Sequence, residues 1–184
     1  MKKFYLIIII IIIGILSFLS IIRTYEEFAL PKVAVTIYPF YDITKEIVGD
    51  KFEVILIVPP GSEPHNFELK PQDILKLQGT KIIFANGYII DGWIKNLTNN
   101  LKSAKIVSLY ENTNLIDQDP HFWLSLENMK KVAQKITQEM QNFDPENKNY
   151  YQKNLENVLD KLNTLLKFAQ NESKNFSSRN IITQ

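Results

Sequence analysis

The stretch KVAVTIYPFYDITKEIVGDKFEVILIV, residues 32–58, decides the fold of this 184-residue chain. It opens with the β-branched run 33–37 and closes with the run 52–58, and both runs are mostly apolar on both faces, as strands buried in a parallel sheet must be. Between them, residues 42–49 carry apolar side chains at helical spacing and end at a glycine. This order predicts a right-handed strand-helix-strand crossover.

The same alternation continues along the chain. Residues 81–85 and 104–109 predict two more strands, while residues 71–79 and 91–101 have helical spacing. The sequence therefore predicts an α/β, Rossmann-like lobe with a roughly four-stranded parallel sheet.

After this lobe the strand-like runs stop, and two helices are predicted. The first has one apolar face over residues 129–140, and the second follows Asp144 and Pro145, a pair typical of an N-cap and a first helical residue. The second helix is roughly thirty residues and about 45 Å long. Its single apolar stripe consists of Tyr151, Leu155, Val158, Leu162, Leu165 and Ala169. Such a helix suits a strut against a lobe, and a coiled-coil dimer is the alternative.

The composition fits one folded domain and excludes several chemistries. The chain is 45% hydrophobic and 22% charged, with a formal net charge of +1 and lysines interspersed among acids. This charge pattern provides no basic stripe for nucleic acid. Cysteine is absent, which excludes disulfides, thiolate metal ligands, cysteine nucleophiles and a lipid-modified cysteine.

The N-terminus predicts export. Lys2 and Lys3 precede a long apolar run over residues 4–22, which is about the length of a bilayer-spanning helix. The run therefore predicts an uncleaved transmembrane anchor, and the excess of lysine before it places the body outside the cytoplasm. The alternatives are a cleaved signal with a secreted or periplasmic product, and a buried core helix.

Both histidines of the chain follow an acid and a proline, in EPHNF (63–67) and DPHFW (119–123). By composition alone, such a prefix precedes a given residue only about once in 200 positions. The first motif follows the second predicted strand at its carboxyl end, where open α/β sheets bind ligands. Neutral imidazole is a common transition-metal ligand, and the proline limits the conformations of the loop before binding. His65 and His121 are therefore predicted metal ligands.

The acids of these motifs, Glu63 and Asp119, are expected either to hydrogen-bond the far nitrogen of the imidazole or to bias the local field. The plainer interpretation of each histidine is a loop cap or a partner for a backbone carbonyl. A rival function is a metallohydrolase in which Glu68 or Asp91 completes a zinc site with an open water position.

Three stretches together resemble one family: the run from VAVTIYPF to DGWIKNL (33–97), DPHFWLSLENMKKVAQKIT (119–137) and FDPENKNYYQKNLENVLDKL (143–162). From about Lys32 to its end, the chain resembles the zinc/manganese-type substrate-binding proteins of ABC importers. The resemblance implies two α/β lobes joined by a long helix, with a metal held between them by three histidines and a carboxylate, or by two of each.

The resemblance carries the first two ligands onto His65 and His121 and the connecting helix onto residues 144–175. It implies a third ligand just after a strand beginning at Asn180 and a fourth further on, and neither lies in this sequence. The expected organisation is therefore an anchor (1–29), a metal-binding lobe (30–143), the connecting helix and the start of a truncated second lobe (176–184).

The implied function is not enzymatic: capture of Zn²⁺ or Mn²⁺ outside the cytoplasm and delivery to an ABC permease, with no nucleic-acid partner. The absence of a His-rich loop between the two motifs favours manganese only slightly. The alternatives are a truncated fragment without function and a surface adhesion module, and the zinc-dependent hydrolase is the weaker rival.

Overall fold

A computed structural model describes residues 2–28, 30–87, 90–97, 101, 103–113 and 119–176. Its internal contacts divide the chain into two units, residues 1–30 and residues 31–184. The first contains helix α1 (Lys2–Phe28) and the second contains the sheet with its helices. The finer division into lobe, connecting helix and second lobe stays a prediction.

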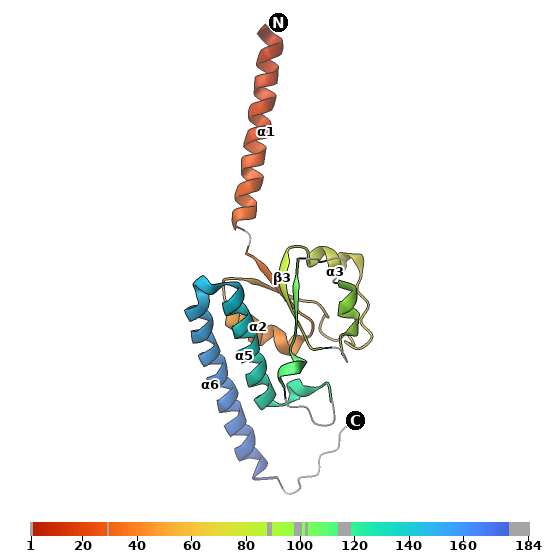
Figure 1. The fold of residues 1–184 in the computed structure, drawn as a ribbon, viewed down its shortest axis with the longest axis vertical. Coiled ribbons are helices and arrows are strands. Elements are labelled where there is room, and N and C mark those ends of the chain that lie inside the picture. Colours follow the sequence, from red (N-terminus) through yellow and green to blue (C-terminus); the bar gives the residue numbers. More distant parts are fainter. Residues whose placement is uncertain are drawn as a thin grey trace. The chain divides into compact units, whose positions relative to one another are not determined.

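The second unit contains a parallel sheet of four strands in the order β2-β1-β3-β4 (Figure 1). The strands are β1 (Lys32–Val35), β2 (Glu53–Leu56), β3 (Thr80–Ala85) and β4 (Lys105–Ser108). In the register of the sheet, Val33 lies opposite Val54 on one side and Ile82 on the other. The predicted α/β class and four-stranded parallel sheet are confirmed.

Alternate side chains of the central strands enter two separate cores. Val33 and Val35 of β1 belong to one apolar cluster, whereas Ala34 belongs to the other. In the same way, Phe84 of β3 lies in the first cluster and its neighbour Ile83 in the second. The sheet is therefore buried on both faces, which is why its strands lack an apolar-polar alternation.

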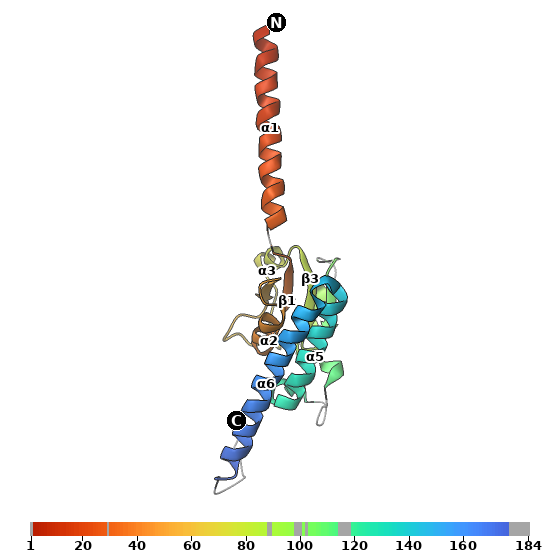
Figure 2. The ribbon, with the colours of Figure 1, turned by 90° about the vertical axis from the view of Figure 1, so that its left-hand side faces the viewer.

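Three helices cover the first face of the sheet: α2 (Tyr38–Val48), α5 (Leu126–Phe143) and α6 (Lys148–Ser173). The short helix α3 (Pro71–Lys76) and the 3-10 helix η1 (Gly92–Asn96) cover the second face. Figures 1 and 2 show α5 and α6 side by side, antiparallel across the first face. Two further 3-10 helices, η2 (Tyr110–Asn112) and η3 (Phe122–Leu124), lie between β4 and α5.

Helix boundaries differ from the sequence expectation at several places. Helix α2 begins at Tyr38 rather than at residue 42, because Pro39 occupies its first turn, where proline's fixed φ suits a helix. The segment expected to be helical over residues 91–101 starts as the 3-10 helix η1, and residues 98–100 lie outside the described part.

Asp144 does not cap the long helix as expected. A 3-10 turn, η4 (Pro145–Asn147), intervenes, and the Asp144 side chain accepts no hydrogen bond from the backbone there. Its carboxylate instead accepts hydrogen bonds from Asn147 Nδ2 at 2.8 Å and from the Tyr151 hydroxyl at 2.5 Å. Burial together with this carboxylate raises the pKa of Tyr151 far above its ordinary value. Asp144 therefore fixes the corner between α5 and α6 through side chains.

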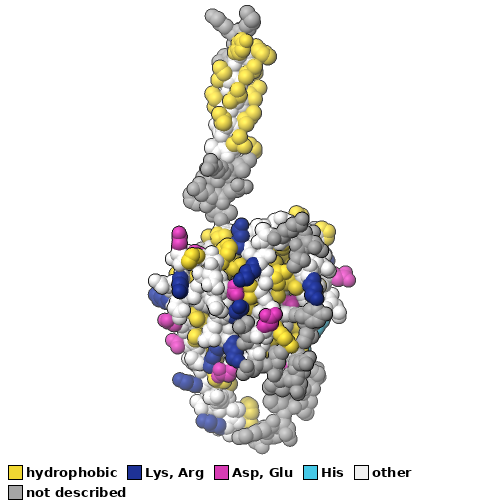
Figure 3. All heavy atoms as spheres, viewed as in Figure 1, with side chains coloured by type: hydrophobic (Ala, Val, Ile, Leu, Met, Phe, Trp, Pro, Cys, Tyr) yellow, Lys and Arg dark blue, Asp and Glu magenta, His cyan; other side chains and the backbone are white. Residues whose placement is uncertain are grey.

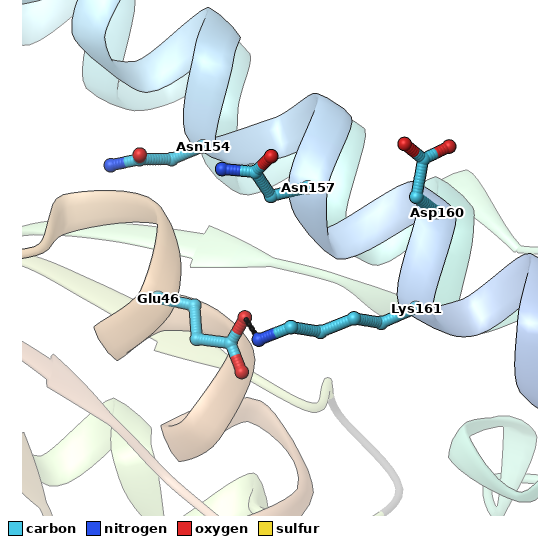
Figure 4. Close-up of a pocket in the computed structure, with 5 residues that line it drawn as sticks. All are labelled: Glu46, Asn154, Asn157, Asp160 and Lys161. Atoms are coloured by element: carbon cyan, nitrogen blue, oxygen red, sulfur yellow. Dashed lines mark hydrogen bonds and ion pairs between the residues drawn. The ribbon is translucent and has the colours of Figure 1, made fainter.

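The apolar stripe of α6 is buried over only part of its length. Tyr151, Leu155 and Val158 are buried against the lobe, whereas Leu165 is 50% exposed. Polar contacts accompany the buried part: Asn154 Nδ2 donates to the Ile47 carbonyl at 3.0 Å. Further along, Lys161 on α6 pairs with Glu46 on α2 at 2.7 Å (Figure 4). The first half of α6 is thus fastened to α2 as a strut.

Apolar side chains of helix α1 between Phe4 and Leu19 are exposed, and Figure 3 shows apolar side chains along this helix. Among the described residues, no helix combines the length and apolarity required to cross a bilayer. The transmembrane anchor expected over residues 4–22 is therefore not supported. The strand expected at residues 181–183 lies outside the described residues.

The buried carboxylate of Glu139 on α5 joins this helix to strand β4. It accepts a hydrogen bond from Lys105 Nζ at 2.5 Å and from Lys135 Nζ at 2.8 Å. Burial acts to raise the pKa of Glu139, but the two ammonium groups outweigh burial and lower it below 4.5. Its stabilising effect is therefore complete above the ordinary value of 4.5 and is lost as the pH falls through the lower folded-state pKa.

We expect Glu139→Gln to lower the free energy of unfolding at neutral pH by about 1 kcal/mol, because Lys105 is exposed and solvent screens its attraction to the carboxylate. The variant should also lose less stability than the parent below pH 4.5. Urea unfolding at a series of pH values measures both effects. Glu127→Gln, at an exposed ion pair on the same helix, is the control. Equal acid sensitivity of parent and Glu139→Gln would contradict this assignment.

Candidate metal centre

The two histidine loops follow the two outer strands of the sheet. His65 lies in the loop after β2, and His121 lies in the loop after β4. Because all four strands are parallel, both loops start from the carboxyl edge of the sheet. They reach toward one another there, and the imidazole centroids are 5.7 Å apart with the rings tilted by 58°. The structure thus brings together the two side chains singled out from the sequence.

Each acid-proline prefix forms the same local brace. The His65 N–H donates to Glu63 Oε1 at 3.2 Å, and the His121 N–H donates to Asp119 Oδ1 at 2.9 Å. The proline between acid and histidine has a fixed φ and no N–H of its own. The acid therefore closes a short turn that holds the backbone of the histidine, which accounts for the repeated motif.

Asp119 also contacts the imidazole of its own motif. Asp119 Oδ1 lies 2.7 Å from His121 Nδ1. The pKa of Asp119 lies below its ordinary value. The main cause is the hydrogen bond that its carboxylate accepts from the backbone N–H of His121, and the next is its contact with the His121 ring. An imidazole held through Nδ1 presents its Nε2 to a ligand, an arrangement typical of histidines that bind metals.

Trp123 packs beside this pair. Its ring centroid lies 5.1 Å from that of His121, edge to face, and 6.5 Å from that of Phe40 in the core. The histidine side chains themselves are exposed: the His121 side chain keeps 43% of its surface open to solvent. The His121 ring therefore packs against Trp123, and both imidazoles are exposed to solvent, where an ion can reach them.

The two carboxylates considered for a hydrolytic site are placed differently. Asp91 is fully buried and accepts hydrogen bonds from the Asn86 N–H at 2.7 Å and the Gly87 N–H at 2.8 Å. Burial raises the pKa of Asp91, although these hydrogen bonds and one with the Thr36 side chain act to lower it. Glu68 is exposed and lines a separate depression with Trp93. Asp91 thus supports the backbone after β3 and does not face an attacking water.

Among the described residues, no group of three or more histidine, cysteine, aspartate or glutamate side chains converges to hold a metal. The described part of the site is the pair of imidazoles with its two acidic braces. Sequence reasoning missed the polar side chains after β3, above all Asn86. The signal for it was the Asn-Gly pair directly after a buried strand, where polar groups at a sheet edge cluster.

Comparison with known proteins identifies the family. Residues 33–184 match the family described as zinc-uptake complex component A, periplasmic. The chain belongs to this family. The resemblance read from the two acid-Pro-His motifs is thereby confirmed.

Two curated relatives of this zinc-uptake family member have different metals in their names. A manganese ABC transporter substrate-binding lipoprotein, PsaA of Streptococcus mitis, is 34% identical over 160 residues, which is 78% of this chain and 52% of the relative. The high-affinity zinc uptake system protein ZnuA of Bacillus subtilis is 30% identical over 173 residues, 83% of this chain and 54% of the relative. The chain spans about half the length of the curated relatives it matches.

A solved structure shares the fold. The metal-dependent lipoprotein YcdH of Bacillus subtilis superposes with a TM-score of 0.71 at 33% identity, covering 78% of this chain and 56% of the other. The similarity therefore extends over the sheet and its helices.

We expect Asp91→Asn to lower the free energy of unfolding by about 1–3 kcal/mol. The asparagine NH₂ would face one of the two backbone N–H groups that the carboxylate now accepts from, leaving a buried donor without a partner. Urea denaturation measures the loss, and Asp160→Asn, at an exposed acid on α6, is the matched control. Equal stability of the two variants would contradict the bracing role of Asp91.

Proposed function

We propose that this chain is the substrate-binding component of a metal-ion ABC importer. It captures Zn²⁺ or Mn²⁺ outside the cytoplasm through His65 and His121 and delivers the ion to a membrane permease. The observation that carries this proposal is the pair of imidazoles 5.7 Å apart at the carboxyl edge of the sheet. Membership of the zinc-uptake family supports it, and so do the metals in the names of its relatives.

The spacing of the rings suits one shared ion. Zinc binds imidazole nitrogen at about 2.0–2.1 Å, and a tetrahedral angle between two such bonds places the ring centroids about 5 Å apart. The observed 5.7 Å differs from this by less than the shift that a rotamer adjustment at either ring provides. The loops therefore need little movement to bind.

Two imidazoles occupy half of a tetrahedral coordination sphere. The remaining positions are open to water or to ligands from outside the described residues. Of the two carboxylates considered for a hydrolytic site, Asp91 is buried and held by backbone N–H groups, and Glu68 lines a separate depression with Trp93. The site therefore favours reversible capture of an ion over hydrolysis.

We expect His65→Ala and His121→Ala each to weaken Zn²⁺ binding by at least about tenfold, because each removes one of two imidazole ligands. The parent should bind one ion per chain. Isothermal titration calorimetry with Zn²⁺ and with Mn²⁺ measures affinity and stoichiometry.

Asn66→Ala is the matched control for these variants, because it truncates an exposed side chain in the same loop and leaves both imidazoles in place. Its affinity should equal that of the parent. Unchanged affinity in both histidine variants would rule out this site as the point of capture.

We further propose that residues 4–22 direct export and keep the body at the outer face of the cell membrane. The two lysines before the apolar run support this, as do the exposed apolar side chains of α1. Without a cysteine to carry a lipid, attachment would depend on this segment.

The expected result is a chain that stays in the membrane pellet after alkaline carbonate extraction and is accessible to protease from outside intact cells. Its N-terminus should be intact by mass spectrometry. A shortened product released from the pellet would disprove the anchor and leave export in place. A product protected from external protease would exclude both.

A further inference from the structure

The segment after β3 touches the loop that carries His65. The Trp93 indole N–H, on η1, donates a hydrogen bond to the Pro64 carbonyl at 3.0 Å. Pro64 directly precedes His65, so this bond fixes the peptide from which the histidine extends. The Trp93 ring also packs against Phe67 on the other side of the histidine, with centroids 5.2 Å apart. Trp93 therefore contacts the loop on both sides of His65.

The same segment touches the loop that carries His121. Asn86 Nδ2 donates to the Pro120 carbonyl at 3.4 Å, and Pro120 directly precedes His121. Asn86 is fully buried, and its backbone N–H is held by Thr36 Oγ1 at 3.1 Å and by Asp91 Oδ2 at 2.7 Å. The two acid-Pro-His motifs thus receive equivalent support, a side-chain N–H donated to the carbonyl of the proline. The bond to Pro120 is long, so the Trp93 bond is the stronger of the two.

The donors of these two bonds belong to one anchored piece of chain. Asp91 lies between them and accepts hydrogen bonds from the backbone N–H groups of Asn86 and Gly87. Gly87 has a φ of 134°, and a Cβ there would lie 2.7 Å from Tyr110 Cβ, so only glycine allows this close approach. Asn86, Gly87 and Asp91 are therefore held together at the end of the central strand β3.

We infer that Asn86, Gly87, Asp91 and Trp93 form a bracket that sets the separation of His65 and His121, with Trp93 and Asn86 as positioning residues for the two imidazoles. The consequence for metal binding rests on the proposed function. The two rings approach one another from the two outer strands of the sheet, β2 and β4. The hydrogen bonds to the Pro64 and Pro120 carbonyls, one in each histidine loop, both come from this bracket.

The energetic reason is the cost of ordering the second ligand. Once one imidazole holds an ion, the affinity depends on how often the other lies within reach, which is its effective concentration. A loop held in the bound conformation avoids the entropy loss of being ordered on binding. Removing one positioning hydrogen bond should therefore weaken metal binding by about three- to tenfold without removing any ligand.

The test uses the absence of cysteine from the chain. A double variant, His65→Cys with His121→Cys, places two thiols at the ligand positions, and a short bis-maleimide bridges them only when the loops are close. Trp93→Phe is then added, since phenylalanine keeps an aromatic ring beside Phe67 and removes the N–H donor together with part of the indole ring. Mass spectrometry of the full chain gives the ratio of the product in which one bis-maleimide joins both thiols to the product in which each thiol carries its own reagent. This bridging ratio measures loop separation without any metal.

We expect Trp93→Phe to lower this bridging ratio and, in the histidine-bearing chain, to weaken Zn²⁺ binding three- to tenfold. Asn86→Ala should act in the same direction through His121. The control is Tyr150→Phe, which removes a hydroxyl that donates to Asp50 at 3.0 Å, just after α2 and away from the histidine loops. Circular dichroism selects a temperature at which every variant is fully folded, so that a general loss of stability does not enter the ratio.

A bridging ratio equal to that of the Tyr150→Phe control in both Trp93→Phe and Asn86→Ala would overturn the bracket, whatever the metal affinities. A lower ratio supports it. If the ratio falls but the parent chain binds neither Zn²⁺ nor Mn²⁺, the bracket stands as a positioning device and the proposed metal capture fails. If the ratio falls and metal affinity does not, the bracket sets the loop separation but this separation does not limit metal binding, and the expected three- to tenfold loss of affinity is wrong.

Discussion

The parallel pairing of β1 and β3 is the constraint on which the rest of this structure depends. These strands form the centre of the sheet, and their alternate side chains fill both apolar clusters. Because parallel strands need crossovers, the chain places helices on both faces and returns each strand in the same direction. Every strand therefore ends at one edge, and both histidine loops begin there.

The site is built outward from that edge. Carbonyl and N–H groups of the two histidine loops are held by Glu63, Asp119, Trp93 and Asn86, and these contacts leave the imidazole rings themselves exposed. Capture of an ion needs this combination, since the backbone must be ordered in advance while the ligand atoms stay accessible. Asp91 differs from the histidines in being fully buried, and its carboxylate accepts hydrogen bonds from the backbone N–H groups of Asn86 and Gly87. Burial therefore removes Asp91 from the ligand candidates.

The chain belongs to the zinc-uptake family and spans about half the length of the curated relatives it matches. The family match covers the sheet, the histidine loops and α6. The buried half of α6 fastens this helix to the lobe, and its exposed half, with Leu165 and Phe168, continues past it.

The sequence by itself determined the features that depend on neighbouring residues. The four strands and the long helix were predicted because apolar spacing and β-branching act within a few residues, and the two acid-Pro-His motifs were recognised as a candidate site from the same local sequence. Local patterns failed at Asp144, where a hydrogen bond to Tyr151 on the next helix replaced the expected cap. Only the tertiary structure decided that the two rings meet and that Asn86 and Trp93 support them. These residues lie on separate loops, and their contacts exist only once the strands take the order β2-β1-β3-β4 and bring the loop ends to one edge.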